Sequence, residues 1–330
     1  MKQIIFNVGG ALSSYIEFDD KKLLVDIGKS QDFNPISDFL NPLFIKRNNE
    51  KSTFSPNKFK LDQLVISHPH NDHISSINEF DEFFHADLLT CPNDNDGMPD
   101  GHKINWGLFE ESKNIDKLKE MLVGRTPPLR TTSDQNEFIY YIPPEECEDD
   151  KTLSNESYCN NISIVVFLIV NQHRVFFPAD IQKEGMKYLL DKNFNLRNKL
   201  KGGVDVLVAP HHGLRSSFST QMFGEMKNGK TNCLNVVSEK VNTSDNREVD
   251  TRYSTSEYCE GKNDIGGDEN HYQVKTSRGH ILIDYKPTNQ PTFEIITDND
   301  ELIEKFNRIW KLPPTMYKNN SGLIAKTKVS

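Results

Sequence analysis

The chain has 330 residues, of which 35% are hydrophobic and 26% are charged, the composition of a globular protein. Its formal net charge of −9 argues against a protein that coats nucleic acid through a broad basic surface, because such binding depends on neutralising phosphates. No apolar run reaches the length of a membrane-spanning helix, and the start of the chain lacks the pattern of a signal peptide. Five scattered cysteines without C-x-x-C spacing indicate reduced thiols, so we expect a cytoplasmic protein without membrane contacts.

The first part of the chain predicts strands that lead into a histidine-rich segment. Residues 41–60 predict a polar, mobile connection, and a helix is expected over 106–124, where apolar residues recur near a helical period. The other elements expected here are strands at 3–9, 13–19, 21–28 and 61–67, a helix at 75–84 and a strand at 87–92.

The second part repeats this alternation of strands and helices. The acidic segment 145–156 is predicted to be a solvated loop, 240–272 a polar insertion or long loop over the surface, and His173 a solvent-exposed turn residue. The other elements expected here are strands at 137–143, 162–170, 173–180, 204–210, 233–239, 280–285 and 292–297, and helices at 182–200, 219–227 and 301–310. Two strand-rich blocks with intervening helices predict two sheets covered by helices outside.

The segment "SHPHNDHI" places metal-capable side chains directly after an apolar strand. Residues two apart on an extended segment point the same way, so His68 and His70 can present both imidazoles to one point. Asp72 and His73 follow where the chain turns into a helix, and they are aimed elsewhere. Two pairs with different directions suit two adjacent metals better than one tetrahedral site. The alternative is a polar strand-to-helix loop in which Asp72 only caps the helix.

Two later strands also end in metal-capable residues. The run "HRVFFPAD" ends in Asp180, and "VDVLVAPHHG" ends in His211 and His212. In layered α/β proteins, functional side chains gather at strand ends, where loops face a common cleft. A carboxylate in such a place can bridge two cations, and a histidine can complete the second site; taken alone, Asp180 can also be an ordinary strand-terminating aspartate.

The pattern H-x-H-x-D-H, followed by a strand-terminal Asp and then "HHG", resembles the metallo-β-lactamase superfamily, and most of all the nuclease-type domain of the ComEC-like DNA-uptake proteins. "IIFNVGGALSSYIEFDDKKLLVDIG" is similar to that family's opening hairpins, "NNISIVVFL", "VFFPAD" and "LVAPHHGLRSS" to its central strands and "KTSRGHILID" to a late one. The resemblance implies a stand-alone α/β domain over residues 1–330 with the four-layer αββα fold, two mixed β-sheets between helices, and polar insertions near 41–60 and 240–272.

One departure from the wider superfamily concerns a histidine between the first cluster and the bridging Asp. This chain has no histidine from 103 to 172, as in the ComEC-like branch, where the corresponding strand begins with Asn. Asn160 or Asn161 is therefore expected to face that metal, or water to replace the ligand. An oxygen-rich site would favour manganese over zinc.

The resemblance implies a binuclear hydrolase that binds two divalent metal ions, Zn²⁺ or Mn²⁺. Asp72 is expected to orient the attacking water as well as to bind metal, and His211 to protonate the leaving oxygen or contact the substrate, or else to make a structural hydrogen bond. Asp26 is expected to orient a ligand imidazole, and Arg215 either grips a phosphate or is solvated. The metal ligands are expected to be His68 and His70 for one ion, Asp72, His73 and His212 for the other, and Asp180 between them.

Three functions remain open from the sequence. The first is a phosphodiesterase or nuclease that acts on DNA, RNA or a nucleotide, for which a role as a bacterial defence effector switched on by a protein partner is one hypothesis. The second is a carbon-ester, lactone or thioester hydrolase, because one fold hosts many chemistries. The third is a catalytically degenerate interaction module.

Overall fold

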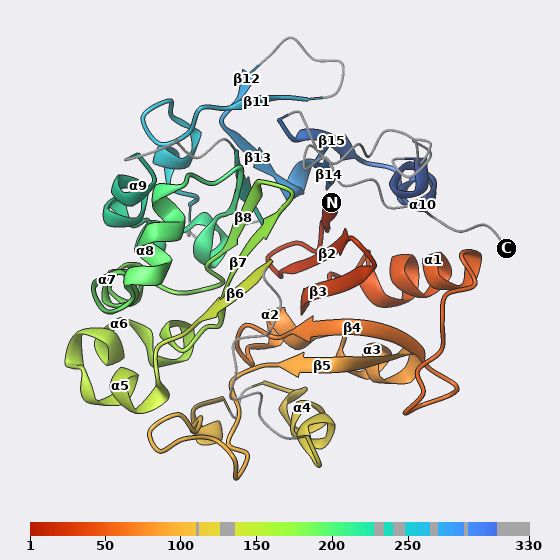
Figure 1. Cartoon of the computed structure of the whole chain (residues 1–330), viewed down its shortest axis with the longest axis horizontal. Coiled ribbons are helices and arrows are strands. Elements are labelled where there is room, and N and C mark those ends of the chain that lie inside the picture. Colours follow the sequence, from red (N-terminus) through yellow and green to blue (C-terminus); the bar gives the residue numbers. More distant parts are fainter. Residues whose placement is uncertain are drawn as a thin grey trace, which may run out of the picture.

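The computed structural model describes residues 1–109, 112–125, 136–227, 234–239, 248–264, 270–286 and 290–308. Two mixed β-sheets pack face to face between two groups of helices (Figure 1). This confirms the predicted α/β fold class. Among the described residues, no helix has both the length and the apolar character that crossing a bilayer requires.

The first sheet has seven strands, antiparallel from β15 to β3 and parallel from β3 to β5. In spatial order they are β15 (Thr292–Ile296), β14 (His280–Asp284), β1 (Lys2–Ile5), β2 (Ser13–Phe18), β3 (Lys21–Ile27), β4 (Phe59–Val65) and β5 (Phe84–Thr90). Its outer face packs against α1 (Asn41–Lys46), α2 (Asn71–Ile74), α3 (Ile77–Phe83), α4 (Ile115–Leu122) and α10 (Asn299–Arg308).

The second sheet has six strands, parallel from β13 to β8 and antiparallel from β8 to β6. In spatial order they are β13 (Gln273–Lys275), β10 (Asn235–Val237), β9 (Val206–Val208), β8 (His173–Phe177), β7 (Val165–Val170) and β6 (Glu137–Tyr140). Its outer helices are α5 (Pro144–Asp149), α6 (Lys151–Asn161), α7 (Lys183–Lys192), α8 (Phe194–Lys201) and α9 (Thr220–Lys227). A small ribbon, β11 (Lys262–Asn263) with β12 (Asn270–His271), lies next to the edge strand β15, where the His271 and Phe293 rings are in contact.

Alternation along the strands builds three separate cores. Leu24 on β3 packs under the helices of the first sheet, whereas its neighbours Leu23 and Val25 face the second sheet. On β7, Phe167 faces helices and Val166 faces the first sheet. Because successive strand residues point to opposite faces, strands that are apolar at every position are buried on both faces, and this produces the layer order helix–sheet–sheet–helix.

Several segments differ from the sequence predictions. Residues 41–46 form α1, whose Leu43 and Phe44 are buried, so the segment 41–60 is not a polar connection throughout. The helix expected over 106–124 is shorter: a 3-10 turn at Trp106–Phe109 precedes α4, and residues 110–111 lie outside the described part. The helix expected over 182–200 is divided at Asn193, whose side chain accepts a hydrogen bond from the backbone N–H of Leu196 and caps α8.

The acidic segment 145–156 was predicted to be a loop, and that prediction is wrong. It forms α5 and the start of α6. Asp150 accepts hydrogen bonds from the backbone N–H groups of Thr152 and Leu153, so an acid in the run serves as a helix cap. The prediction for His173 is also wrong: it is buried, and its Nε2 contacts the carbonyl oxygen of Lys286 at 2.6 Å.

Candidate metal centre

Three strand ends supply the residues of the site, as the sequence predicts. The first cluster follows β4, Asp180 follows β8, and His211 and His212 lie on a 3-10 turn, Pro210–Gly213, after β9. The two sheets direct these ends toward one another, so residues more than 100 positions apart in the sequence meet.

Asp72, His73, Asp180 and His212 form the candidate metal cluster, in which one ligand atom from each residue lies within 4.8 Å of the others. His73 Nε2 is 3.4 Å from Asp180 Oδ1, and His212 Nε2 is 3.4 Å from Asp72 Oδ2 and 3.8 Å from Asp180 Oδ2. Asp180 therefore contacts both imidazoles, which is where a bridging carboxylate is expected.

His68 and His70 lie beside this cluster and contact each other. His68 Nε2 is 2.8 Å from His70 Nδ1, and the ring centroids of His68 and His73 are 4.2 Å apart. The extended backbone thus points both imidazoles to one place, as predicted for an H-x-H pair. The His70 ring also meets Phe109, at 5.4 Å between centroids.

Asp26 orients His73 through a buried network. Its Oδ2 lies 2.8 Å from His73 Nδ1 and accepts a hydrogen bond from Ser67 Oγ, and its Oδ1 accepts one from the Ser67 backbone N–H. A proton held on Nδ1 leaves Nε2, which faces Asp180, free to bind a cation.

His212 is oriented by a backbone carbonyl that the sequence did not indicate. Its Nδ1 lies 3.2 Å from the carbonyl oxygen of Ser238, and the Ser238 hydroxyl donates to the carbonyl oxygen of Ala11 in the first sheet. The turn is also held by Asp250, whose backbone N–H donates to the carbonyl oxygen of Gly213. Ser67 and Ser238 were missed because their contacts depend on tertiary packing; the only local signal was the position of Ser67 beside His68.

His211 lies at the edge of the cluster. Its Nε2 is 3.8 Å from Asp180 Oδ2, and burial lowers the pKa of this imidazole. His211 and His212 both have left-handed backbone, with φ of 47° and 57°. The turn therefore presents consecutive imidazoles to Asp180 from different directions.

The charges of the cluster are strongly coupled. Burial lowers the pKa of His73, but the carboxylates of Asp180, Asp26 and Asp72 outweigh it and hold that pKa well above its usual value. Burial raises the pKa of Asp180, yet His73 and His212 bring it well below the usual range. The Asp180 carboxyl is thus ionised near neutral pH and attracts cations.

Buried polar atoms that have no hydrogen-bond partner show whether the cluster fits a metal ion. Within the described residues, His73 Nε2 and His212 Nε2 are buried without a hydrogen-bond partner, although the first lies at 3.4 Å from Asp180 and the second at 3.4 Å from Asp72. An orphaned buried imidazole nitrogen is costly unless something binds it. Imidazole and carboxylate are also the donors that zinc and manganese take in proteins. The cluster therefore fits a divalent metal ion.

Three other residues named in the sequence analysis lie outside the four-residue cluster. Asn161 does not turn toward a metal: its Nδ2 donates to the carbonyl of Leu153 and its Oδ1 accepts from the backbone N–H of Gln182, so it joins α6 to the Asp180 loop. Asn160 is buried, and its Oδ1 has no partner in the described structure. Arg215 is exposed on the turn after Gly213.

The sequence model of the metallo-beta-lactamase superfamily matches residues 6–153, which include His68, His70, Asp72 and His73. Similar solved structures include the metallo-beta-lactamase fold protein YhfI from Bacillus subtilis, at 12% identity and a TM-score of 0.32, covering 63% of this chain and 70% of that one. Another is the short form of human tRNase Z, at 11% identity and a TM-score of 0.28, covering 68% of this chain and 87% of that one.

No curated protein matches the sequence significantly. The family match over residues 6–153 supports a metallo-β-lactamase superfamily domain, and the two mixed sheets between helices are consistent with that fold.

Proposed function

We propose that the chain is a metal-dependent hydrolase of the metallo-β-lactamase superfamily that cleaves phosphodiesters in DNA, RNA or a nucleotide. The observation that carries the hydrolase assignment is the meeting of the buried His73 and Asp180 with the partly buried Asp72 and His212, in which the Nε2 atoms of both imidazoles have no hydrogen-bond partner among the described residues. The phosphodiester preference rests on the order of the motifs and on the lack of a histidine between 103 and 172, both of which resemble the ComEC-like nuclease domains.

In this proposal, two groups of residues would bind two divalent ions. In the proposal, Asp72, His73 and His212 hold one ion, His68 and His70 hold a second, and Asp180 lies between them. Bound divalent ions supply Lewis acidity toward a substrate oxygen and toward water. Asp26 keeps His73 in the tautomer whose Nε2 can bind a cation. His211, beside Asp180 and with a lowered pKa, is neutral near pH 7 and can hold a proton-accepting nitrogen at the edge of the site.

The test joins metal analysis to a substrate panel. The purified protein, supplied with Mn²⁺ or Zn²⁺, is offered single- and double-stranded DNA, RNA and bis-p-nitrophenyl phosphate, with a lactone and a thioester beside them. We expect cleavage of a phosphodiester, and a loss of about 100-fold or more together with bound metal in Asp180→Asn. The exposed Asp100→Asn serves as the matched control and is expected to behave as wild type.

Two outcomes would contradict the proposal. Cleavage of the lactone or thioester with all phosphodiesters untouched assigns the chain to carbon-ester chemistry of the same fold. Less than one ion per chain, with no effect of Asp180→Asn, makes the chain an interaction module.

Addition of a protein partner is tested in the same panel, because the proposed role as a partner-activated effector requires low activity of the isolated chain.

A further inference from the structure

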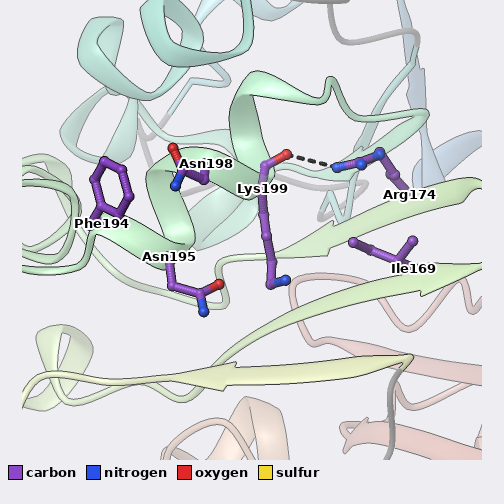
Figure 2. Close-up of a pocket in the computed structure, with 6 residues that line it drawn as sticks. All are labelled: Ile169, Arg174, Phe194, Asn195, Asn198 and Lys199. Carbon is purple, nitrogen blue, oxygen red and sulfur yellow. Dashed lines mark hydrogen bonds between the residues drawn. The ribbon is translucent and has the colours of Figure 1, made fainter.

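A cavity lies on the helix-covered face of the second sheet, between β7, β8 and α8. It has a volume of about 350 Å³ and is lined by Ile169, Arg174, Phe194, Asn195, Asn198 and Lys199 (Figure 2). Ile169 and Arg174 are direct partners in the β7–β8 ladder, so their side chains share one face. Arg174 is near the start of β8, whereas Asp180 follows its end. The cavity is therefore separate from the candidate metal cluster.

Among the residues that the structure describes, no carboxylate neutralises two cationic groups of this cavity. No carboxylate of the described residues lies within 4.0 Å of the Arg174 guanidinium or the Lys199 ammonium, and the Asp205 carboxylate binds the backbone N–H of Arg174 instead. Partial burial and the nearby Arg174 lower the pKa of Lys199, so the two positive charges repel each other. In a chain with a net charge of −9, paired cations without a counterion indicate a place for an anion.

The polar side chains that line the cavity keep N–H groups that can donate hydrogen bonds to a ligand. Arg174 Nη1 donates to the carbonyl oxygen of Lys199, and the guanidinium has four further N–H groups. The Lys199 ammonium lies 3.2 Å from the centroid of the Phe138 ring. Asn195 Oδ1 accepts from Tyr140, which leaves its Nδ2 to donate. Figure 2 shows Lys199 and Asn195 extending from α8 in the same direction, toward the strands.

The apolar side chains of the cavity suit a flat ring. Phe194, at the start of α8, is 70% exposed, and Ile169 supplies an apolar wall. Exposed aromatic rings are the surfaces on which nucleobases stack. The volume exceeds what a single phosphate needs and falls in the range of small-molecule sites.

We propose that this cavity binds a nucleotide at a site separate from the metal cluster. Arg174 and Lys199 bind the phosphate, Phe194 stacks on the base, and Asn195 with Asn198 donates to its polar edge. Arginine and lysine together with carboxamides are the side chains that phosphates and base edges commonly bind. A nucleotide held here is a bound ligand and not the hydrolysed substrate, since no metal-binding cluster of the described residues lies among the lining side chains.

The test is a calorimetric titration of the full chain with adenosine 5′-monophosphate, with adenosine and inorganic phosphate as separate arms. A chelator is present throughout, so that ions at Asp180 and its neighbours cannot hold the phosphate. The proposal thereby stands or falls independently of the hydrolase activity. Saturable binding of the nucleotide, tighter than that of either fragment, is the expected result.

Two pairs of variants locate the site. Lys199→Met keeps an alkyl stem against Phe138 and removes the charge, and we expect about tenfold weaker binding of the nucleotide. Lys201→Met, on the same helix but outside the lining, is the matched control and is expected to bind as wild type. Phe194→Ala is expected to remove the preference for nucleotide over phosphate, whereas Phe54→Ala, also highly exposed, is expected to keep it.

Thermal melts of each variant show whether the fold is retained before binding is compared. No binding of the nucleotide to the folded wild-type chain overturns the proposal. Equal losses in Lys199→Met and Lys201→Met also overturn it, because they indicate non-specific attraction to the helix. Binding of inorganic phosphate as tight as that of the nucleotide leaves an anion site and rejects the nucleotide.

Discussion

At the residue scale, several residues of the candidate metal centre have a left-handed backbone conformation. Asp26, Ala179, His211 and His212 have φ between 47° and 57°, a region that residues other than glycine seldom adopt. Each such residue costs about 1–3 kcal/mol and persists only where its surroundings hold it. These residues are the carboxylate that orients His73, the residue before Asp180 and both histidines of the turn. The backbone strain therefore lies at the residues that position the candidate metal ligands.

Asp26→Asn tests whether the carboxylate sets the tautomer of His73. Asparagine has the same shape and tolerates left-handed backbone, but its amide N–H₂ would donate to His73 Nδ1 and move the imidazole proton to Nε2. We expect metal affinity to fall by about 10–100-fold, with the fold retained. Metal titration followed by activity measures this, and excess metal is expected to restore the activity.

The exposed Asp32→Asn is the control for that experiment and is expected to leave metal affinity unchanged. Wild-type affinity in Asp26→Asn would show that the His73 tautomer does not depend on this carboxylate.

At the element scale, the site depends on how closely α2 approaches the first hairpin. The carbonyl oxygen of Asp72 accepts a hydrogen bond from the backbone N–H of Leu12, and the N–H of Gly28 donates to the carbonyl of Leu12. A Cβ on Gly28 would lie 2.1 Å from the Asp72 carbonyl oxygen and 2.8 Å from that of Leu12. Both are backbone atoms, so a side chain at position 28 would displace the helix that carries Asp72 and His73.

Gly28→Ala is therefore expected to lower the free energy of unfolding by about 1–3 kcal/mol and to weaken metal binding. Gly224→Ala is the matched control, because a Cβ there meets nothing within 4 Å and the residue lies inside α9. We expect that control to be neutral or stabilising by up to about 1 kcal/mol. Denaturant melts and metal titration of both variants check the expectation, and a Gly28→Ala protein as stable and as metal-competent as wild type would contradict it.

At the scale of the whole molecule, a buried carboxyl joins the two sheets. Gln63 on β4 donates through Nε2 to Glu137 Oε1 on β6, at 2.8 Å. Burial raises the pKa of Glu137 to about 7 from 4.5. The folded protein therefore retains this proton over a pH range in which the unfolded chain loses it, and the contact between the sheets depends on pH.

The stability that this proton supplies is complete below pH 4.5 and is lost as the pH rises through about 7. Glu137→Gln removes the titration but keeps the acceptor for Gln63. We expect the variant to be more stable than wild type above pH 7, by up to about 3 kcal/mol, and the difference to shrink toward pH 4.5. Urea melts from pH 4.5 to 8 measure it, with the exposed Glu50→Gln as control. A difference that does not change with pH would show that folding does not raise the pKa of Glu137.

The sequence by itself determined most of the strands, the layers and the residue types of the site, but not the short strands β11, β12 and β13. Apolar alternation follows the two-residue period of a strand, and the ligand pattern after β4, β8 and β9 is local in the chain. It did not determine the acidic helices α5 and α6, because α6 is capped by the side chain of Asp150, which periodicity does not register, and α5 has no side-chain cap.

Only the tertiary structure decided which atoms meet. The contacts of Asp26 with Ser67 and His73, of Ser238 with His212 and of Gln63 with Glu137 join segments far apart in the chain, and several use backbone atoms that every residue possesses. The same holds for Arg174 and Lys199, whose lack of a counterion emerges only once β8 and α8 are packed together. Local sequence fixes periodicity and chemistry, whereas the packing of the two sheets fixes distance, burial and the tautomer of each imidazole.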